Sequence, residues 1–143
     1  MGREIIYQDL SYKINGLLFK TQNDLGRYRN EKQYGDYFES LLKEAGLKYK
    51  REERIIKSFP GEKSGRNVCD FIVENKIVIE MKVVGFLDKN SYFQIKRYLA
   101  SSKLILGILV NFRQQYLRPK RILNNELLKR IQRDGLSNLE RTN

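Results

Sequence analysis

The sequence has 143 residues, of which 28 are Lys or Arg and 17 are Asp or Glu, with no His and a single Cys. Without histidine, Ser-His-Asp and Cys-His nucleophile systems, histidine general bases and Cys/His zinc sites are excluded, so any chemistry must use carboxylates, lysine, tyrosine or hydroxyl groups. The length and the 41% hydrophobic content predict one folded domain, while the net charge of +11 favours an anionic partner or serves only solubility.

Two helices are predicted at the start of the chain. Apolar residues recur at helical spacing over residues 9–25, and Gly26 stands where this helix would end. Asn30 and Gln33 have the spacing of a capping box, and an apolar stripe then continues to Gly46. We therefore expect two helices joined by a short connection.

Strand-like patterns occupy the middle of the chain. Alternating residues at 47–56 precede a loop of turn residues at 59–65. Two β-rich runs follow at residues 67–73 and 77–84, and only residues 74–76 separate them, which is typical of a hairpin.

The last third of the chain completes an α/β unit. A helix is predicted at about residues 91–101, and a strongly apolar strand follows at residues 104–111. A basic tail then begins at Phe112, with a short helix expected at about residues 126–133.

Charged residues interrupt the second run of the hairpin. Residues 77–84 are apolar except for Glu80 and Lys82, which share one face of the strand because they are two positions apart. If residues 74–76 form a three-residue loop, Asp70 lies directly opposite Glu80, with the Cβ atoms about 5 Å apart. Like charges that close destabilise a sheet unless positive charge lies between them.

A divalent cation would supply that positive charge together with Lys82. Oxygen ligands suit Mg²⁺ (or Mn²⁺), whereas the lack of His and Cys ligands disfavours zinc. A cation held here would acidify a water and neutralise charge on phosphate oxygens, and Lys82 could orient that water or stabilise the transition state. The alternative is an exposed hairpin in which Glu and Lys pair across the strands without a metal.

Two further polar residues interrupt apolar stripes. Glu31 lies three residues before Tyr34 and so continues the buried stripe of the second helix, although the helix dipole also favours a first-turn glutamate. Gln94 lies four residues before Tyr98, where it could reach a metal-bound water or a phosphate or could simply face solvent.

A set of short motifs is spread in order over about residues 9–124. They are Ile14-Asn15-Gly16, Leu25-Gly26, Glu31 with Tyr34, Gly46-Leu47-Lys48, Cys69 to Val73, Ile77 to Lys82, Gln94 with Tyr98-Leu99, and Leu109 to Phe112. Together they resemble the GxxExxY family, a branch of the PD-(D/E)XK nuclease superfamily. Two positions depart from the family pattern: Tyr28 replaces its first motif glycine, and Cys69 replaces the proline before Asp70.

This resemblance implies a restriction-endonuclease-like α/β fold, a single domain with a mixed central sheet flanked by helices. We assign residues 1–124 to this nuclease-like domain and residues 125–143 to a basic C-terminal extension with a short helix. The residues implied as catalytic are Asp70, Glu80, Lys82, Gln94 and Glu31, with Asp70, Glu80 and Glu31 as the metal ligands.

The distribution of charge along the chain agrees with a site that grips a phosphate backbone. Residues 1–44 are neutral and residues 67–85 carry −1, whereas residues 45–66, 86–111 and 112–143 carry +4, +3 and +5. Basic segments therefore surround an acidic centre. The contacts that we predict for nucleic acid are Lys96, Arg97, Arg118, Lys120 and Arg121.

We therefore predict a Mg²⁺-dependent nuclease, a phosphodiesterase acting on nucleic acid, with DNA favoured over RNA. The alternative is a non-catalytic nucleic-acid-binding module, for DNA or for RNA and the ribosome, that retains the nuclease-like fold. A lone cysteine, no charged and apolar leader and no apolar stretch of about 18 residues predict a cytoplasmic protein without a membrane partner. The limited surface of so small a domain makes a homodimer a further expectation.

Overall fold

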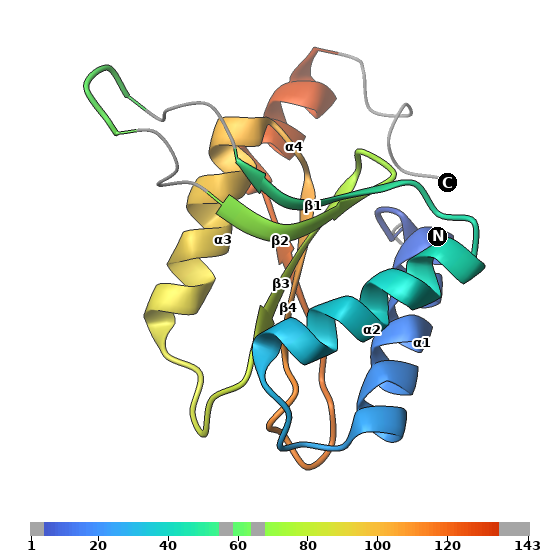
Figure 1. The fold of residues 1–143 in the computed structure, drawn as a ribbon. Helices are drawn as coiled ribbons and strands as arrows, with labels where there is room; N and C mark the ends of the chain where they lie inside the picture. The colour runs from blue at the N-terminus through green and yellow to red at the C-terminus, as the bar shows by residue number, and fades with distance from the viewer. Residues whose placement is uncertain (1–4, 55–58, 64–67, 135–143) are drawn as a thin grey trace.

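A mixed five-stranded sheet lies between helices in the computed structural model, which describes residues 5–54, 59–63 and 68–134 (Figure 1). Neighbours in the sheet are consecutive in the chain, and β3 and β4 run parallel while the other neighbouring pairs are antiparallel. The elements are α1 (Gln8–Leu25), α2 (Glu31–Glu44), β1 (Tyr49–Arg54), β2 (Val68–Val73), β3 (Ile77–Lys82), α3 (Lys89–Ser102), β4 (Leu106–Asn111), β5 (Lys120–Leu123) and α4 (Asn125–Arg133). The described chain is a single α/β domain, as the sequence predicts.

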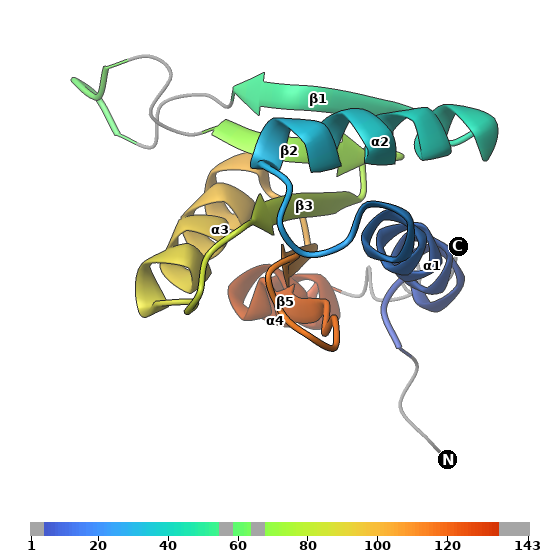
Figure 2. The ribbon, with the colours of Figure 1, turned by 60° about the horizontal axis from the view of Figure 1, so that its bottom comes forward.

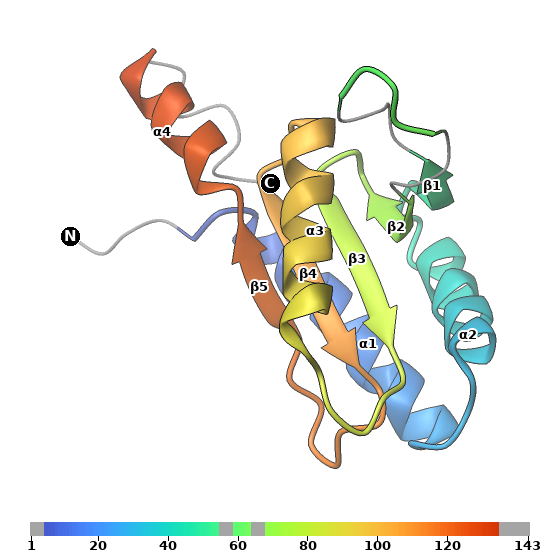
Figure 3. The same cartoon turned by 90° about the vertical axis from the view of Figure 1, so that its left-hand side faces the viewer.

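Helices cover both faces of the sheet. The first two helices pack on one face, and their buried residues form one core cluster with Phe71, Ile79 and Ile108. On the other face α3 packs through Ile95 and Leu99 in a second cluster (Figure 2). Figure 3 shows the same layering from the side, with α3 in front of β3 and β4 and with α1 behind them. The central strands β3 and β4 are therefore buried on both faces, which explains their continuous apolar sequence.

Local capping chemistry sets the starts of two helices. The side chain of Asn30 accepts a hydrogen bond from the Gln33 N–H at 2.9 Å, and the Gln33 side chain accepts one from the Asn30 N–H at 3.0 Å. This is the predicted capping box, and it fixes the start of α2. Asp88 caps α3 in the same way by accepting from the Ser91 N–H at 3.2 Å, so α3 begins earlier than the sequence pattern predicts.

The predicted hairpin between β2 and β3 is confirmed. Val73 pairs with Ile77, which leaves Glu74, Asn75 and Lys76 as a three-residue loop. Glu74 and Asn75 both take left-handed φ angles of 54°, and the Glu74 carboxylate accepts from the Lys48 N–H at 2.5 Å. Next to the loop, the strand pairing therefore has the register from which the sequence predicts Asp70 opposite Glu80.

One strand of the sheet is missing from the prediction. Residues 120–123, which the sequence pattern places in a basic tail, form the edge strand β5 against β4. Only Ile122 of this strand is buried, so it lacks the apolar run by which the central strands are recognised. The following helix α4 packs its apolar side loosely on the core through Leu127, Leu128 and Ile131.

Some predicted segments extend beyond the residues that the structure describes. The predicted strand at 47–56, the loop at 59–65 and the C-terminal extension each reach into residues that the structure does not describe. Within residues 5–54, 59–63 and 68–134, no helix is both long and apolar enough to cross a membrane.

Candidate active site

The sheet opens where Asp70 and Glu80 lie. The β2–β3 ladder ends at the pair Phe71 and Ile79, one step before these two carboxylates would face each other. Beyond that pair the Met81 N–H donates at 2.6 Å to the Asp70 carboxylate instead of continuing the ladder. Figure 1 shows the cause at the level of the strands, since β1 and β2 run crosswise to β3 and β4. The opening gives the two carboxylates room that a regular hairpin would deny them.

The backbone is irregular on both sides of Asp70. In a regular strand Cys69 and Phe71 would share a face, but Cys69 packs in the cluster under α3 and Phe71 in the cluster under α1 and α2. On the neighbouring strand Glu52, which the register places opposite Asp70, has a left-handed φ of 54°. Such a conformation is strained for a residue other than glycine and is concentrated at functional sites.

Glu80 is a buried carboxylate beside a second carboxylate. Only 6% of the surface of Glu80 is exposed to solvent. Burial is the largest cause that raises its pKa, to about 10, and the hydrogen bond and negative charge of Asp70 act in the same direction. The charge of Glu31 adds a smaller upward effect, while that of Lys82 opposes it. Glu80 therefore holds a proton at neutral pH unless more positive charge is brought to it.

Lys82 and Gln94 meet beside this pair. The Lys82 Nζ atom donates to the Gln94 Oε1 atom at 3.5 Å, and both side chains are half-buried. Lys82 leaves the end of β3, whereas Gln94 comes from the second turn of α3, which covers the same face. The structure thus brings together the Lys and Gln that the sequence selects from separate elements.

Glu31 lies across a small hollow from Asp70. It is the first residue of α2 and is exposed, and both carboxylates line a cavity of about 150 Å³ between α2, β1 and β2. Arg51 and Glu52 line the same cavity. This arrangement separates Glu31 from the close Asp70–Glu80 pair while leaving it near enough for its charge to act on Glu80.

Arg51 is a site residue that sequence reasoning missed. Its guanidinium bonds Asp36 at 2.7 Å and Glu39 at 3.0 Å, and it lies 5.5 Å from the centre of the Phe71 ring. A side chain at Gly35 would come within 2.5 Å of this guanidinium, so the glycine makes room for it. A signal was present in the sequence, because Arg51 follows Leu47 and Tyr49 at alternate positions and so falls on the face of the strand that they share.

The donor set suits a hard cation that keeps most of its water. Within the described residues, no group of three or more Cys, Asp or Glu side chains is arranged to hold a metal ion, and the role of Glu31 as a third ligand stays a prediction. Asp70 and Glu80 remain as a close pair, and the buried Glu80 stays uncharged at neutral pH without a cation beside it. Mg²⁺ is commonly held by one or two carboxylates together with waters and substrate phosphates, so Asp70 and Glu80 fit it.

The cations predicted to bind nucleic acid fall into two groups. Arg97, Arg118 and Lys120 are exposed. Lys96 instead donates to the Leu123 carbonyl at 2.8 Å. Arg121 donates to the Ser11 hydroxyl at 2.9 Å and to the Ile6 carbonyl at 2.8 Å, and its burial lowers the pKa of its guanidinium. The last two therefore also have structural partners, and their role toward nucleic acid stays a prediction.

Comparison with known proteins places the chain in a family. The family model of the PD-(D/E)XK nuclease superfamily matches residues 8–123. The chain belongs to the PD-(D/E)XK nuclease superfamily. Asp70 and the sequence Glu80-Met81-Lys82 stand in the order that the superfamily's name describes, and the GxxExxY branch stays a prediction.

The comparison with solved structures finds a weaker likeness. The chain is similar to the protein of "Crystal structure of SSO0001", with 20% identity and a TM-score of 0.49 over 99% of this chain and 80% of that one. A search of curated proteins finds no match.

Proposed function

We propose that this protein is a nuclease that hydrolyses phosphodiester bonds of nucleic acid with Mg²⁺ or Mn²⁺, and that its substrate is DNA. The observation that carries the proposal is the pairing of Asp70 with the buried Glu80 where the sheet opens, with Lys82 beside them. Membership in the PD-(D/E)XK nuclease superfamily supports the same chemistry.

Asp70 and Glu80 are the residues that would hold the cation. When bound, it would neutralise charge on the scissile phosphate and lower the pKa of a water. The two carboxylates also position that phosphate, because their own negative charge repels it from any approach except through the cation. Glu31, across the cavity, would act on this centre as a third ligand or through a water.

Lys82 brings a positively charged side chain of the protein to this site. Its ammonium has three donors, of which one is directed to Gln94, so others can orient the attacking water or bind a phosphate oxygen. Gln94 accepts through its oxygen and keeps its amide N–H donors for a phosphate. In the reaction the water oxygen forms a bond to phosphorus and the bond to the leaving oxygen breaks. The attacking water loses one proton to solvent and the leaving oxygen takes one up from solvent, which gives a phosphomonoester and a free hydroxyl group.

The test is cleavage of DNA by purified protein with Mg²⁺ or Mn²⁺. We expect wild-type protein to cut, and we expect Asp70→Asn and Glu80→Gln to abolish cutting while thermal unfolding stays cooperative. Glu44→Gln removes an exposed carboxylate at the end of α2 and serves as the matched control that cuts normally. Full cleavage by both site variants would overturn the proposal, and DNA binding without cleavage by wild-type protein would favour a non-catalytic module.

A further inference from the structure

Exposed aromatic residues and arginines gather in the connections at one end of the molecule. Three connections meet there, residues 26–30, 83–88 and 112–119, as Figures 1 and 3 show. Each presents a large aromatic residue to solvent: Tyr28 is 75% exposed, Phe86 83% and Tyr116 73%. The same three segments contain four arginines and a single acidic residue.

Two arginines from different connections lie close to the ring of Tyr28. The guanidinium carbons of Arg27 and Arg113 lie 5.4 Å and 5.3 Å from the centre of its ring. The two arginines also bond each other's backbone: Arg27 Nε donates to the Arg113 carbonyl at 2.9 Å, and Arg113 Nε donates to the Arg27 carbonyl at 3.1 Å. The three side chains are thus joined into one unit, although Tyr28 remains mostly open to solvent.

A buried aromatic pair supports this unit from below. Tyr34 stacks on Phe112 with ring centres 4.3 Å apart and planes 7° from parallel, and neither residue is exposed. The Tyr34 hydroxyl donates to the Gly26 carbonyl at 2.5 Å and accepts from the Arg29 N–H at 3.3 Å. The connection that carries Tyr28 is therefore fixed at both ends to the core.

The connection that carries Arg113 is fixed as well. The buried Gln22 amide donates to the Phe112 carbonyl at 3.0 Å and to the Gln114 carbonyl at 2.7 Å. The ring and guanidiniums are therefore preorganised, and a ligand that binds them does not have to order a loose loop.

This unit adjoins the candidate active site on two sides. Asn111 pairs with Lys82 in the parallel ladder, and its side chain accepts from the Arg113 N–H at 3.2 Å. On the other side Tyr28 stands three residues before Glu31. The unit is thus linked to Lys82 through β4 and to Glu31 through the start of α2, so a bound strand that leaves Asp70 and Glu80 in this direction would pass Tyr28.

The chemistry of the unit matches a nucleotide whose base is unpaired. An exposed aromatic ring can stack on any base face, and guanidiniums bind phosphate through charge-assisted hydrogen bonds. In a continuous duplex the base faces are covered by neighbouring bases, so the ring would find a partner only where a base is unpaired.

We propose that Tyr28, with Arg27 and Arg113, is a stacking site for an unpaired DNA base next to the scissile phosphate. The preferred substrate is then DNA with a single-stranded segment at the active site, such as a single strand, a flap or a junction. This inference rests on the proposed nuclease function for the position of the phosphate, whereas the stacking itself is independent of cleavage.

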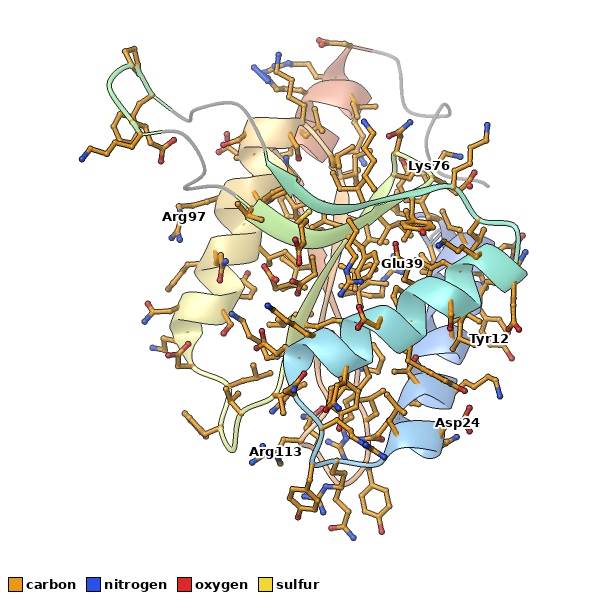
Figure 4. All side chains as sticks on the ribbon, in the orientation of Figure 1. Tyr12, Asp24, Glu39, Lys76, Arg97 and Arg113 are labelled. Atoms are coloured by element: carbon orange, nitrogen blue, oxygen red, sulfur yellow. The ribbon has the colours of Figure 1, made fainter. Side chains whose placement is uncertain are left out.

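The test measures binding with metal removed by EDTA, so that no cleavage occurs. A fluorescent single-stranded DNA and the duplex of the same sequence are titrated with wild-type protein, Tyr28→Ala, Tyr28→Phe and Tyr12→Ala. Tyr12 is the matched control, an 81% exposed tyrosine on α1 that lies well away from Arg113 in Figure 4. Thermal unfolding of each variant checks that the fold is kept.

We expect Tyr28→Ala to weaken single-strand binding by at least about fivefold, which corresponds to the lower end of the contribution of one aromatic–base stack. Tyr28→Phe keeps the ring and should bind as wild type does, as should Tyr12→Ala, and duplex binding should not change in any variant. Unchanged single-strand binding by Tyr28→Ala, or an equal loss for duplex and single strand, would overturn the inference. Wild-type protein that shows the expected Tyr28 effect but never cuts DNA would instead contradict the nuclease proposal alone.

Discussion

Mg²⁺ binding is expected to displace the proton that Glu80 holds, so raising the pH should tighten Mg²⁺ binding. The folded protein raises the pKa of Glu80 from 4.5 to about 10, chiefly through burial and then through Asp70. Between these two values the folded protein without metal holds a proton that the unfolded chain has lost. A cation that needs the charged carboxylate must expel that proton when it binds.

The size of the effect follows from one displaced proton. The apparent affinity for Mg²⁺ should increase about tenfold for each pH unit, which is about 1.4 kcal/mol per unit. Without metal the sign for folding is the opposite: because the folded state binds more protons than the unfolded state, the free energy of unfolding falls as the pH rises through this window. Mg²⁺ should therefore stabilise the protein more at slightly alkaline than at slightly acidic pH.

Isothermal titration calorimetry with Mg²⁺ measures both quantities. Titrations in two buffers of different ionisation enthalpy at one pH give the number of protons released, and titrations at several pH values give the slope. Glu80→Gln carries no titratable proton there and should bind Mg²⁺ weakly with no pH dependence, whereas Glu44→Gln should behave as wild type. Wild-type affinity that is the same at acidic and alkaline pH, with no proton released, would refute the reasoning.

Three further predictions concern stability and binding. Gly107→Ala would place a Cβ atom 2.7 Å from an Ile side chain of α3 and should lower the free energy of unfolding by about 1–3 kcal/mol in urea denaturation. Gly16→Ala, which has open space within α1, should instead raise the free energy of unfolding by up to about 1 kcal/mol. A similar effect of both changes would contradict the packing of α3 on β4. Arg121→Met removes donors to two buried partners and should cost about 1–3 kcal/mol of stability in unfolding curves. Lys120→Met, at an exposed position, should leave stability unchanged and weaken DNA binding in salt-dependent titrations. A Lys120→Met variant that binds DNA as wild type does would show that Lys120 is not part of the interface. Asn30→Ala breaks the capping box and should cost about 1 kcal/mol in thermal unfolding, with an unaltered melting curve counting against the cap.

Features that depend on neighbouring residues were predictable from the sequence. The capping box of α2 and the three-residue hairpin loop need only side chains and backbone a few positions apart, and both are confirmed. A short loop fixes which residues of a hairpin face each other, so the sequence predicts Asp70 opposite Glu80, but the ladder ends one step before this pair and the two do not form a regular cross-strand pair. The edge strand β5 was missed because a short strand with one buried residue has too weak a pattern.

The opening of the sheet was not predictable from local patterns. The left-handed backbone at Glu52 and the change of face between Cys69 and Phe71 depend on how β1 and β2 cross β3 and β4. Strand alternation alone gives a regular ladder, in which Glu80 would be an ordinary cross-strand partner. The burial that raises its pKa is a property of the folded layers, because both α2 and α3 exclude solvent from this part of β3.

The hydrogen-bond partners of the basic residues could not be predicted from the sequence either. Arg121 and Lys120 are adjacent in the sequence and both carry positive charge, yet Arg121 holds the segment before α1 while Lys120 faces solvent. Contacts across more than a hundred positions decide this difference, as the bond from Arg121 to Ile6 shows. Charge counts along a chain therefore locate a basic surface but do not tell which cations remain available to a partner.

A crystal soaked in Mn²⁺ tests the claim about Asp70 and Glu80 most directly, because the anomalous signal of Mn²⁺ locates the ion without reference to activity. We predict one ion held by a carboxylate oxygen of Asp70 and one of Glu80, with waters completing its shell and Lys82 on the side of the bound water. Saturating Mn²⁺ with no ion at this pair, or an ion bound only to other carboxylates, would contradict the proposed role of these two residues.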